Sequence, residues 1–426
     1  MSNTKNDMAW EKLFEKYRIV ESIVKNNAFT IKSSQINEFR ESRLMTKFDY
    51  KSQLPKIFAE HNLSILPNSR SSYIISNFET FKNFETSNPV VENISFPNYI
   101  ESIDYNNITS ESTALNCAYI TGMIEDFVQD ENLKPTVNGR MGSSKFEFNI
   151  NSKNGLLHIA VTNSQMEIDG GYEGVNFLSL IETKNSLSND FLIRQMYYPY
   201  RLWNNRISKK VNSLFLTYTN GIFHFREYEF EDVNLYNSLV LKREKKYSIR
   251  DGSINLETIQ QIINSVIKVE EPKIAFPQAD SFERVINLCE LLNKHKTLNR
   301  DDITENYDFD SRQTNYYTDA ARYLGIVDKK FEKGKVAYFL TTRGKKLFNL
   351  SIFSRQIEFI KLILTHSAFN ETLKLYFKKS EEPSKQEIVG IMKSANLYNV
   401  RSESTFQRRS STVLSWINWI LEQIEE

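Results

Sequence analysis

Asn220-Gly221 separates two short segments rich in β-branched and aromatic residues, 213–219 and 222–228. An Asn-Gly pair readily adopts the left-handed backbone that a two-residue turn requires, so this sequence predicts an antiparallel β-hairpin. Further strands are predicted at 145–149, 156–162, 165–170 and 176–183, and helices at 109–129 and 190–206. The order helix, strands, helix, strands predicts an α/β domain with a mixed sheet.

Four regions can be distinguished along the 426 residues, which predicts a multidomain α/β protein. Residues 1–95 mix predicted helices and strands, and 105–268 hold the α/β pattern. Residues 278–350 predict three helices and a β-hairpin, which is the order of a winged helix. Residues 351–426 are nearly all helical in pattern, with a polar break near 381–385, and resemble a second winged-helix-like unit without a clear wing.

Composition excludes several classes of protein. No apolar run approaches the roughly 20 residues that span a bilayer, and the N-terminal residues lack the basic and apolar segments of a secretory signal. Cys117 and Cys289 lie too far apart in sequence for a zinc spacing or a disulfide framework. We therefore expect a cytoplasmic protein without a membrane partner. The net charge of +1 does not by itself indicate a nucleic-acid partner.

The most informative residues are Asp169, which ends one β-like run, and Glu182-Thr183-Lys184, which ends the next. Residues two apart in a strand point to the same side, so Glu182 and Lys184 share a face. If the two strands pair, Asp169 stands beside Glu182. Two carboxylates with an ammonium group are suited to hold Mg²⁺ and to orient a water molecule for phosphodiester hydrolysis.

A spacing of this kind is common, and ion-paired ends of surface strands would also explain it. The context favours a site. Apolar runs precede both the acid and the Glu-Thr-Lys, Gly170-Gly171 permits a tight connection after Asp169, and a predicted helix carrying Gln195 follows. Glu167 is a rival ligand if the strand register differs.

Asp169…Glu182-Thr183-Lys184 resembles the active-site signature of the PD-(D/E)XK nuclease superfamily, with Ile168 in place of the proline that names the motif. The predicted helix that carries Gln195 resembles the helix that supports the active site in several branches of this superfamily. With SRLMTKFD near its start and winged-helix-like segments behind, the whole chain resembles type II restriction endonucleases. The resemblance implies a sequence-specific, Mg²⁺-dependent endonuclease of double-stranded DNA. It also implies a PD-(D/E)XK core, in which helices flank the mixed β-sheet.

The resemblance also implies residue roles. Asp169 and Glu182 would bind the metal, Lys184 would be the catalytic lysine, and Gln195 would touch the site or a backbone phosphate. An acid on the first core helix often completes such sites; Glu125 is the first candidate and Glu111 the second, although either is equally explained as an exposed helix acid.

Side chains suited to DNA gather in the C-terminal half. Arg, Gln and Asn can contact base edges from the start of a recognition helix, and basic residues at a wing can contact phosphate. The candidates are Arg312, Gln313 and Asn315 for base edges, Lys333 and Lys335 at the wing, and Arg408 and Arg409 on the last helix. A winged helix used for protein contact, or a solvated basic face, would give the same pattern.

Motifs that the sequence lacks exclude several cofactors and fused activities. No G-x-x-x-x-G-K-[ST] segment occurs, so we expect no nucleotide cofactor, and the five scattered histidines predict no zinc site. No segment resembling Asn-Pro-Pro-Tyr occurs, so a protecting DNA methyltransferase would be a separate protein. A double-strand cut requires two active sites or two successive events, which suggests a homodimer. The alternatives are a non-catalytic winged-helix DNA-binding regulator and a structure-specific repair or recombination nuclease.

Overall fold

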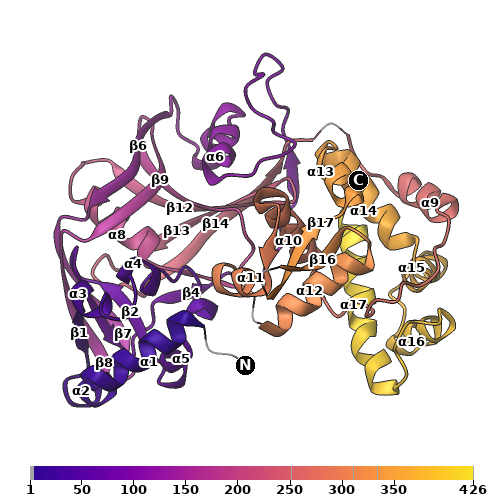
Figure 1. The fold of residues 1–426 in the computed structure, drawn as a ribbon. Helices are drawn as coiled ribbons and strands as arrows, with labels where there is room; N and C mark the ends of the chain where they lie inside the picture. The colour runs from indigo at the N-terminus through magenta and orange to yellow at the C-terminus, as the bar shows by residue number, and fades with distance from the viewer. Residues whose placement is uncertain (1–3, 251, 310, 333, 426) are drawn as a thin grey trace. The chain divides into compact units, whose positions relative to one another are not determined.

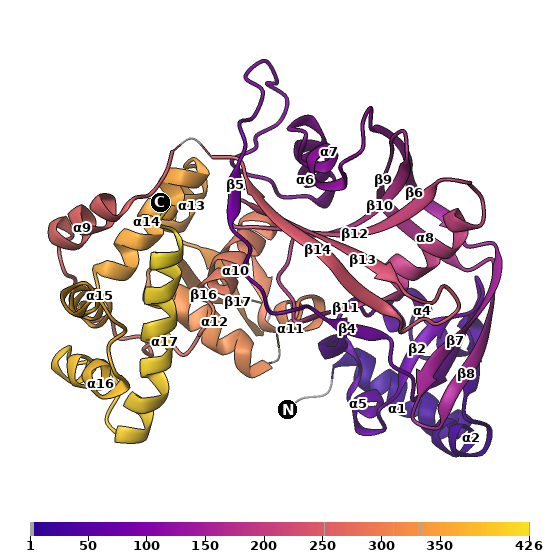
Figure 2. The same ribbon diagram turned by 180° about the vertical axis from the view of Figure 1, so that it is seen from behind.

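The computed structural model describes residues 4–250, 252–309, 311–332 and 334–425 (Figures 1 and 2). The chain divides into two compact units. Unit 1 contains Met1–Glu92, Ala114–Tyr218 and Phe223–Tyr247, and unit 2 contains Asn93–Thr113, Thr219–Ile222 and Ser248–Glu426. The protein is a mixed α/β protein, as expected. Among the described residues, no helix is both long and apolar enough to cross a membrane.

The N-terminal part of unit 1 is a small α/β layer around an aromatic core. Its elements are α1 (Lys5–Tyr17), α2 (Ile19–Asn26), β1 (Phe29–Lys32), α3 (Ser33–Ile36), α4 (Ser42–Met45), η1 (Lys51–Gln53), α5 (Lys56–Glu60), β2 (Ser64–Pro67) and β3 (Ser72–Ser76). The strands pair antiparallel in the order β1-β3-β2. Trp10, Phe14 and Phe58 contact one another edge to face, and the Trp10 indole donates to the Met45 carbonyl at 2.9 Å.

The main sheet of unit 1 has seven strands among the described residues, in the order β5-β14-β13-β12-β10-β9-β6. These are β5 (Val91–Asn93), β6 (Lys134–Gly142), β9 (Gln165–Glu173), β10 (Phe177–Lys184), β12 (Lys210–Thr219), β13 (Ile222–Phe230) and β14 (Leu239–Ser248). Strand β10 is antiparallel to β9 and parallel to β12, so the sheet is mixed. The hairpin expected at Asn220-Gly221 is confirmed, because both residues have positive φ, 51° and 74°.

Helices lie on both faces of this sheet (Figures 1 and 2). α6 (Glu111–Ile120) and α7 (Met123–Val128) lie on one face, where Tyr119 stacks on Tyr172 of β9 with ring centroids 5.3 Å apart. α8 (Arg194–Asn204) lies on the other face and contacts β9 and β10. Two antiparallel ribbons complete the unit: β7 (Lys145–Ser152) with β8 (Gly155–Thr162), and β4 (Phe81–Asn83) with β11 (Asp190–Leu192).

Several expectations for this unit were wrong in detail. No strand was predicted between the helix at 109–129 and residue 145, yet β6 lies there, and its pairing with β9 contains register shifts. The helix expected over 109–129 is divided at Gly122, where φ is 77°. Strand β5 was not predicted, and the helix expected over 190–206 begins only after strand β11.

In unit 2, the described part of residues 278–350 contains three helices and a β-hairpin in the order expected for the predicted winged helix. The elements are α10 (Phe282–His295), β15 (Leu298–Asn299), α11 (Arg300–Asn306), α12 (Ser311–Tyr323), β16 (Val327–Glu332), β17 (Lys335–Leu340) and α13 (Thr342–Phe348). β15, β17 and β16 form an antiparallel sheet. The other helices are α9 (Leu256–Ser265), α14 (Ile352–Leu364), α15 (Ser367–Lys379), α16 (Lys385–Ser394) and α17 (Glu403–Glu422).

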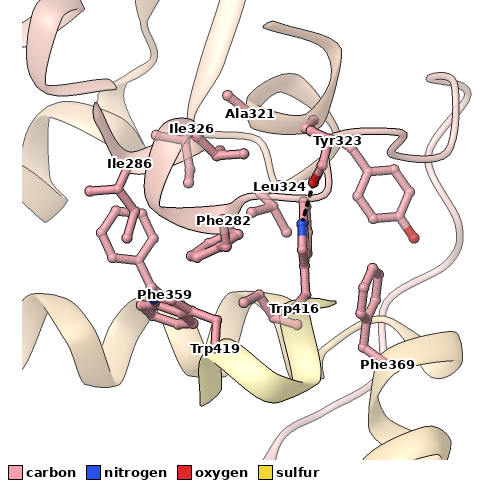
Figure 3. Close-up of a cluster of buried hydrophobic side chains, with 14 of the residues drawn as sticks. Phe282, Ile286, Ala321, Tyr323, Leu324, Ile326, Phe359, Phe369, Trp416 and Trp419 are labelled. Carbon is pink, nitrogen blue, oxygen red and sulfur yellow. Dashed lines mark hydrogen bonds between the residues drawn. The ribbon is translucent and has the colours of Figure 1, made fainter. Parts of the chain in front are cut away.

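One hydrophobic core joins the winged-helix segment to the C-terminal helices (Figure 3). Phe282 of α10 contacts Trp416 and Trp419 of α17, with ring centroids 4.8 and 4.5 Å apart. The Trp416 indole stacks on Phe369 of α15 and donates a hydrogen bond of 2.8 Å to the Ala279 carbonyl. The regions 278–350 and 351–426 therefore bury their apolar faces against each other.

Candidate active site

Strands β9 and β10 bring Asp169, Glu182 and Lys184 together. The antiparallel register pairs Ile181 with Gly170, which places Asp169 beside Glu182 at the next position. The Lys184 ammonium group contacts Glu182 Oε1, so the two side chains share a face. The Thr183 amide donates to Asp169 Oδ2 at 2.8 Å and fixes that carboxylate against β10.

Gly170 and Gly171, which follow Asp169, lie inside a strand and let the neighbouring strands approach closely. Gly170 and Gly171 were expected to form a tight connection, but both lie within β9. A Cβ atom on Gly171 would lie 2.7 Å from the Val137 Cβ of β6 and 3.2 Å from a Leu180 methyl of β10. The absence of a side chain at Gly171 therefore lets the three strands approach at the level of the acids.

Gln195, in the first turn of α8, connects the cluster to the N-terminal segment. Its Nε2 donates to Glu182 Oε1 at 2.6 Å and lies 3.4 Å from Asp49 Oδ1. Asp49 is held there by its own backbone, because the Leu192 amide donates to the Asp49 carbonyl at 3.1 Å. Sequence reasoning missed Asp49 as a site residue, although it ends the segment SRLMTKFD.

Burial controls the charge of the two central acids. It raises the pKa of Glu182 to about 8, against the opposing attraction of Lys184. Burial also raises the pKa of Asp169, again opposed by Lys184. The charge of Asp49 also raises the pKa of both acids. Burial thus favours the neutral carboxyl forms of both acids, and a bound cation would favour the ionised forms.

The other acids considered from the sequence have different surroundings, although the charge of Glu167 also raises the pKa of Asp169. Glu125 is exposed on α7 and accepts a hydrogen bond from the Asn132 amide at 3.3 Å. Glu167 is exposed and pairs with Arg140 at 3.3 Å, while Glu111 lies in the first turn of α6. Within the described ranges no three His, Cys, Asp or Glu side chains are grouped as metal ligands. The structure thus gives Glu125 a partner on the loop after α7, and its role as a third ligand stays a prediction.

The described residues that were expected to contact DNA all lie in unit 2, and they differ from one another in exposure and in partners. Arg312 is exposed and Asn315 half-buried on α12, and Gln313 lines a cleft of the same unit. Lys335 pairs with Asp301 at 2.6 Å. Arg408 is exposed and Arg409 half-buried on α17. Lys333 lies outside the described residues.

Comparison with known proteins yields three matches, each to a domain of unknown function. They cover residues 7–75 (DUF6996), 76–248 (DUF6997) and 284–425 (DUF7226). No curated protein and no solved structure matches the chain. Asp169, Glu182, Lys184 and Gln195 all fall within the second match, whereas Asp49 falls within the first. The proximity of Asp49 to Gln195 therefore joins two of these domains in one candidate site.

Proposed function

We propose that the protein is a Mg²⁺-dependent endonuclease that hydrolyses phosphodiester bonds of double-stranded DNA, with a PD-(D/E)XK-type core. The observation that carries this proposal is the convergence of Asp169, Glu182 and Lys184 on one face of β9 and β10. As in the type II restriction enzymes that the sequence resembles, cleavage would occur at a defined sequence in a restriction–modification system. A separate methyltransferase would protect host DNA, and a homodimer would cut both strands.

The residues present fit a magnesium ion. Mg²⁺ in proteins is commonly held by one or two carboxylates, with water and substrate phosphate completing its shell, so a third acidic ligand is not required. Asp169 and Glu182 supply the two carboxylates. In the described part of the chain, the buried Gln195 Oε1 accepts no hydrogen bond, which leaves a polar acceptor next to Glu182. When bound, the ion would activate water and neutralise charge on the phosphate.

The protein groups would then have distinct tasks. Lys184 carries three N–H donors at the edge of the acid pair, with 11% of its side chain exposed, so it can orient the attacking water or donate to a phosphate oxygen. Gln195 fixes one oxygen of Glu182, and the Thr183 amide fixes one oxygen of Asp169. These bonds restrict both carboxylates before the substrate arrives.

The test is digestion of supercoiled plasmid, both methylated and unmethylated, with Mg²⁺ and with EDTA. We expect discrete fragments with Mg²⁺ only, and sequencing of their ends gives the recognition site. Asp169→Asn and Lys184→Met should abolish cleavage and keep binding to a DNA duplex. Glu147→Gln, at an exposed acid of β7, is the matched control. Glu167→Gln separately tests the rival acid, whose charge raises the pKa of Asp169.

The alternative functions give other outcomes. Binding to duplex DNA without cleavage of either plasmid, with Mg²⁺ or Mn²⁺, would indicate a regulator and overturn the proposal. Cleavage confined to branched or nicked substrates would indicate a repair or recombination nuclease. Loss of cleavage in Glu167→Gln with retention in Asp169→Asn would move the active site to the rival acid.

A further inference from the structure

A cleft of about 450 Å³ opens in unit 2 between residues of α12, α16 and α17. Gln313 and Tyr316 line it from the first two turns of α12, Lys385 from the first turn of α16, and Arg408 and Ser411 from α17. The expected recognition helix and the last helix, which are far apart in sequence, therefore share one concave surface.

The cations of this cleft differ from their neighbours in lacking acid partners. Lys379 pairs with Glu387 at 3.0 Å, and Lys393 pairs with Glu403 at 2.7 Å. Lys385 and Arg408 are exposed, and within the portion of the chain that the structure describes neither forms an ion pair. Two adjacent positive charges that the protein does not neutralise attract an anion.

Arg409 adds a third cation beside the cleft. Its Nε and Nη1 atoms are buried and, among the described residues, have no hydrogen-bond partner. Burial lowers the pKa of its guanidinium, as does repulsion from Arg408, whereas the nearby Tyr316 opposes the shift. A buried donor without an acceptor costs free energy. A phosphate oxygen in the cleft would supply the missing acceptor once the guanidinium turned outward.

The remaining lining suits a nucleic acid rather than a simple anion. Asp280 is the acid in the lining, and its Oδ1 accepts a hydrogen bond from the Thr412 hydroxyl at 2.6 Å. Gln313 carries an amide that can contact a base edge, and Tyr316 offers an aromatic face and a hydroxyl next to the cations. Cations for phosphate thus lie next to polar groups that can read bases.

We propose that this cleft binds double-stranded DNA jointly through α12 and α17, with backbone phosphate held by Lys385, Arg408 and Arg409 while Gln313 faces the bases. The inference rests on the proposed function, in which DNA is the substrate, and it assigns the last helix, together with the start of α16, to the DNA-binding surface. A winged helix that used only α12 and its wing would leave α17 without a role in binding.

The test measures binding without cleavage. A fluorescein-labelled duplex of random sequence is titrated in EDTA with the full-length protein, over a series of salt concentrations. Lys385→Ala/Arg408→Ala should weaken binding several-fold and reduce the slope of log affinity against log salt by about 2, because each removed cation leaves one phosphate with its counterion. Both residues are exposed, so the fold should be retained, which a thermal unfolding scan checks.

Lys345→Ala/Lys346→Ala is the matched control. Both lysines are exposed on α13, so the double substitution removes two positive charges from the same unit but outside the cleft. We expect the control to keep the wild-type salt slope, and Arg409→Met, which removes one cation, to reduce the slope by about 1. Equal affinities and equal slopes for the cleft and control variants would overturn the proposal. Binding in EDTA does not depend on cleavage, so the two proposals can fail separately. If the cleft binds DNA but the protein never cleaves it, only the proposed nuclease function is overturned.

Discussion

Gln195 and Glu182 are joined by a hydrogen bond of 2.6 Å from the Gln195 amide to Glu182 Oε1. The same nitrogen lies 3.4 Å from Asp49, so one side chain connects the first turn of α8, strand β10 and the N-terminal segment. Gln195 is therefore a positioning residue, because it holds a carboxylate whose orientation the proposed chemistry requires.

The first prediction is that Gln195→Ala lowers the cleavage rate about 10- to 100-fold, the usual cost of removing a group that orients a metal ligand. The decrease should be partly offset by a higher Mg²⁺ concentration, because the freed carboxylate would still be present but less ordered. Single-turnover cleavage over a Mg²⁺ series measures both effects. Gln261→Ala is the control, since Gln261 is exposed on α9 and its side chain bonds to Glu257 one turn away on the same helix. Equal rates for the two variants would show that Gln195 does not position Glu182.

The second prediction concerns pH. Burial raises the pKa of Glu182 to about 8, so below that pH the metal-free protein holds a proton on this carboxyl. Mg²⁺ binding requires the ionised form, hence releases that proton, and the apparent affinity should fall by up to about tenfold for each pH unit below about 8. Titration calorimetry in buffers of different ionisation enthalpy measures the affinity and the proton release together. Glu182→Gln should abolish both; a flat affinity across this range in the wild type would contradict the assignment of Glu182 as a ligand.

Local pattern was sufficient for part of the site. Alternation along β10 places Glu182 and Lys184 on one face, and the amphipathic stretch after residue 190 places Gln195 on a helix. Asp49 could not be predicted, because its contact with Gln195 spans 146 residues and depends on how the N-terminal segment pairs with the backbone at Leu192. The division of the helix expected over 109–129 was likewise not predicted, because it depends on a single glycine, Gly122, with φ of 77°.

Tertiary pairing also overrode local signals in the fold. The proline at 135 and the glycines of β9 indicate a turn when read alone, yet the seven-stranded sheet accepts them at register shifts and close strand contacts. Likewise, the apolar faces of 278–350 and 351–426 each predict a separate module. Only the three-dimensional contacts show that the two faces bury each other.

The third prediction tests whether the strands around Gly171 leave no room for a side chain. Gly171→Ala should destabilise unit 1 by about 1–3 kcal/mol, because the new methyl group would lie 2.7 Å from Val137 Cβ with strands on both sides. Gly390→Ala in α16 is the opposite case: its Cβ meets nothing within 4 Å, so a helix-favouring residue should stabilise by about 0.5–1 kcal/mol. Urea unfolding of both variants measures the change in the free energy of unfolding, which should be negative for Gly171→Ala and positive for Gly390→Ala. A neutral or stabilising Gly171→Ala would mean that β6 and β10 leave room for a methyl group between them.

The last prediction concerns the shared core of unit 2. Trp416 contacts Phe282 and Phe369 and donates to the Ala279 carbonyl, so Trp416→Ala removes a large buried side chain and leaves that carbonyl without its donor. The cost should be about 3–5 kcal/mol. If the winged-helix segment and the C-terminal helices form one cooperative unit, amide hydrogen exchange should accelerate equally in α10 and in α17. Tyr398→Ala, at a side chain 42% exposed, should leave both rates unchanged. Faster exchange confined to α17 would show instead that the two segments unfold separately, and the proposed DNA cleft would then lie between two independently mobile parts rather than on one rigid surface.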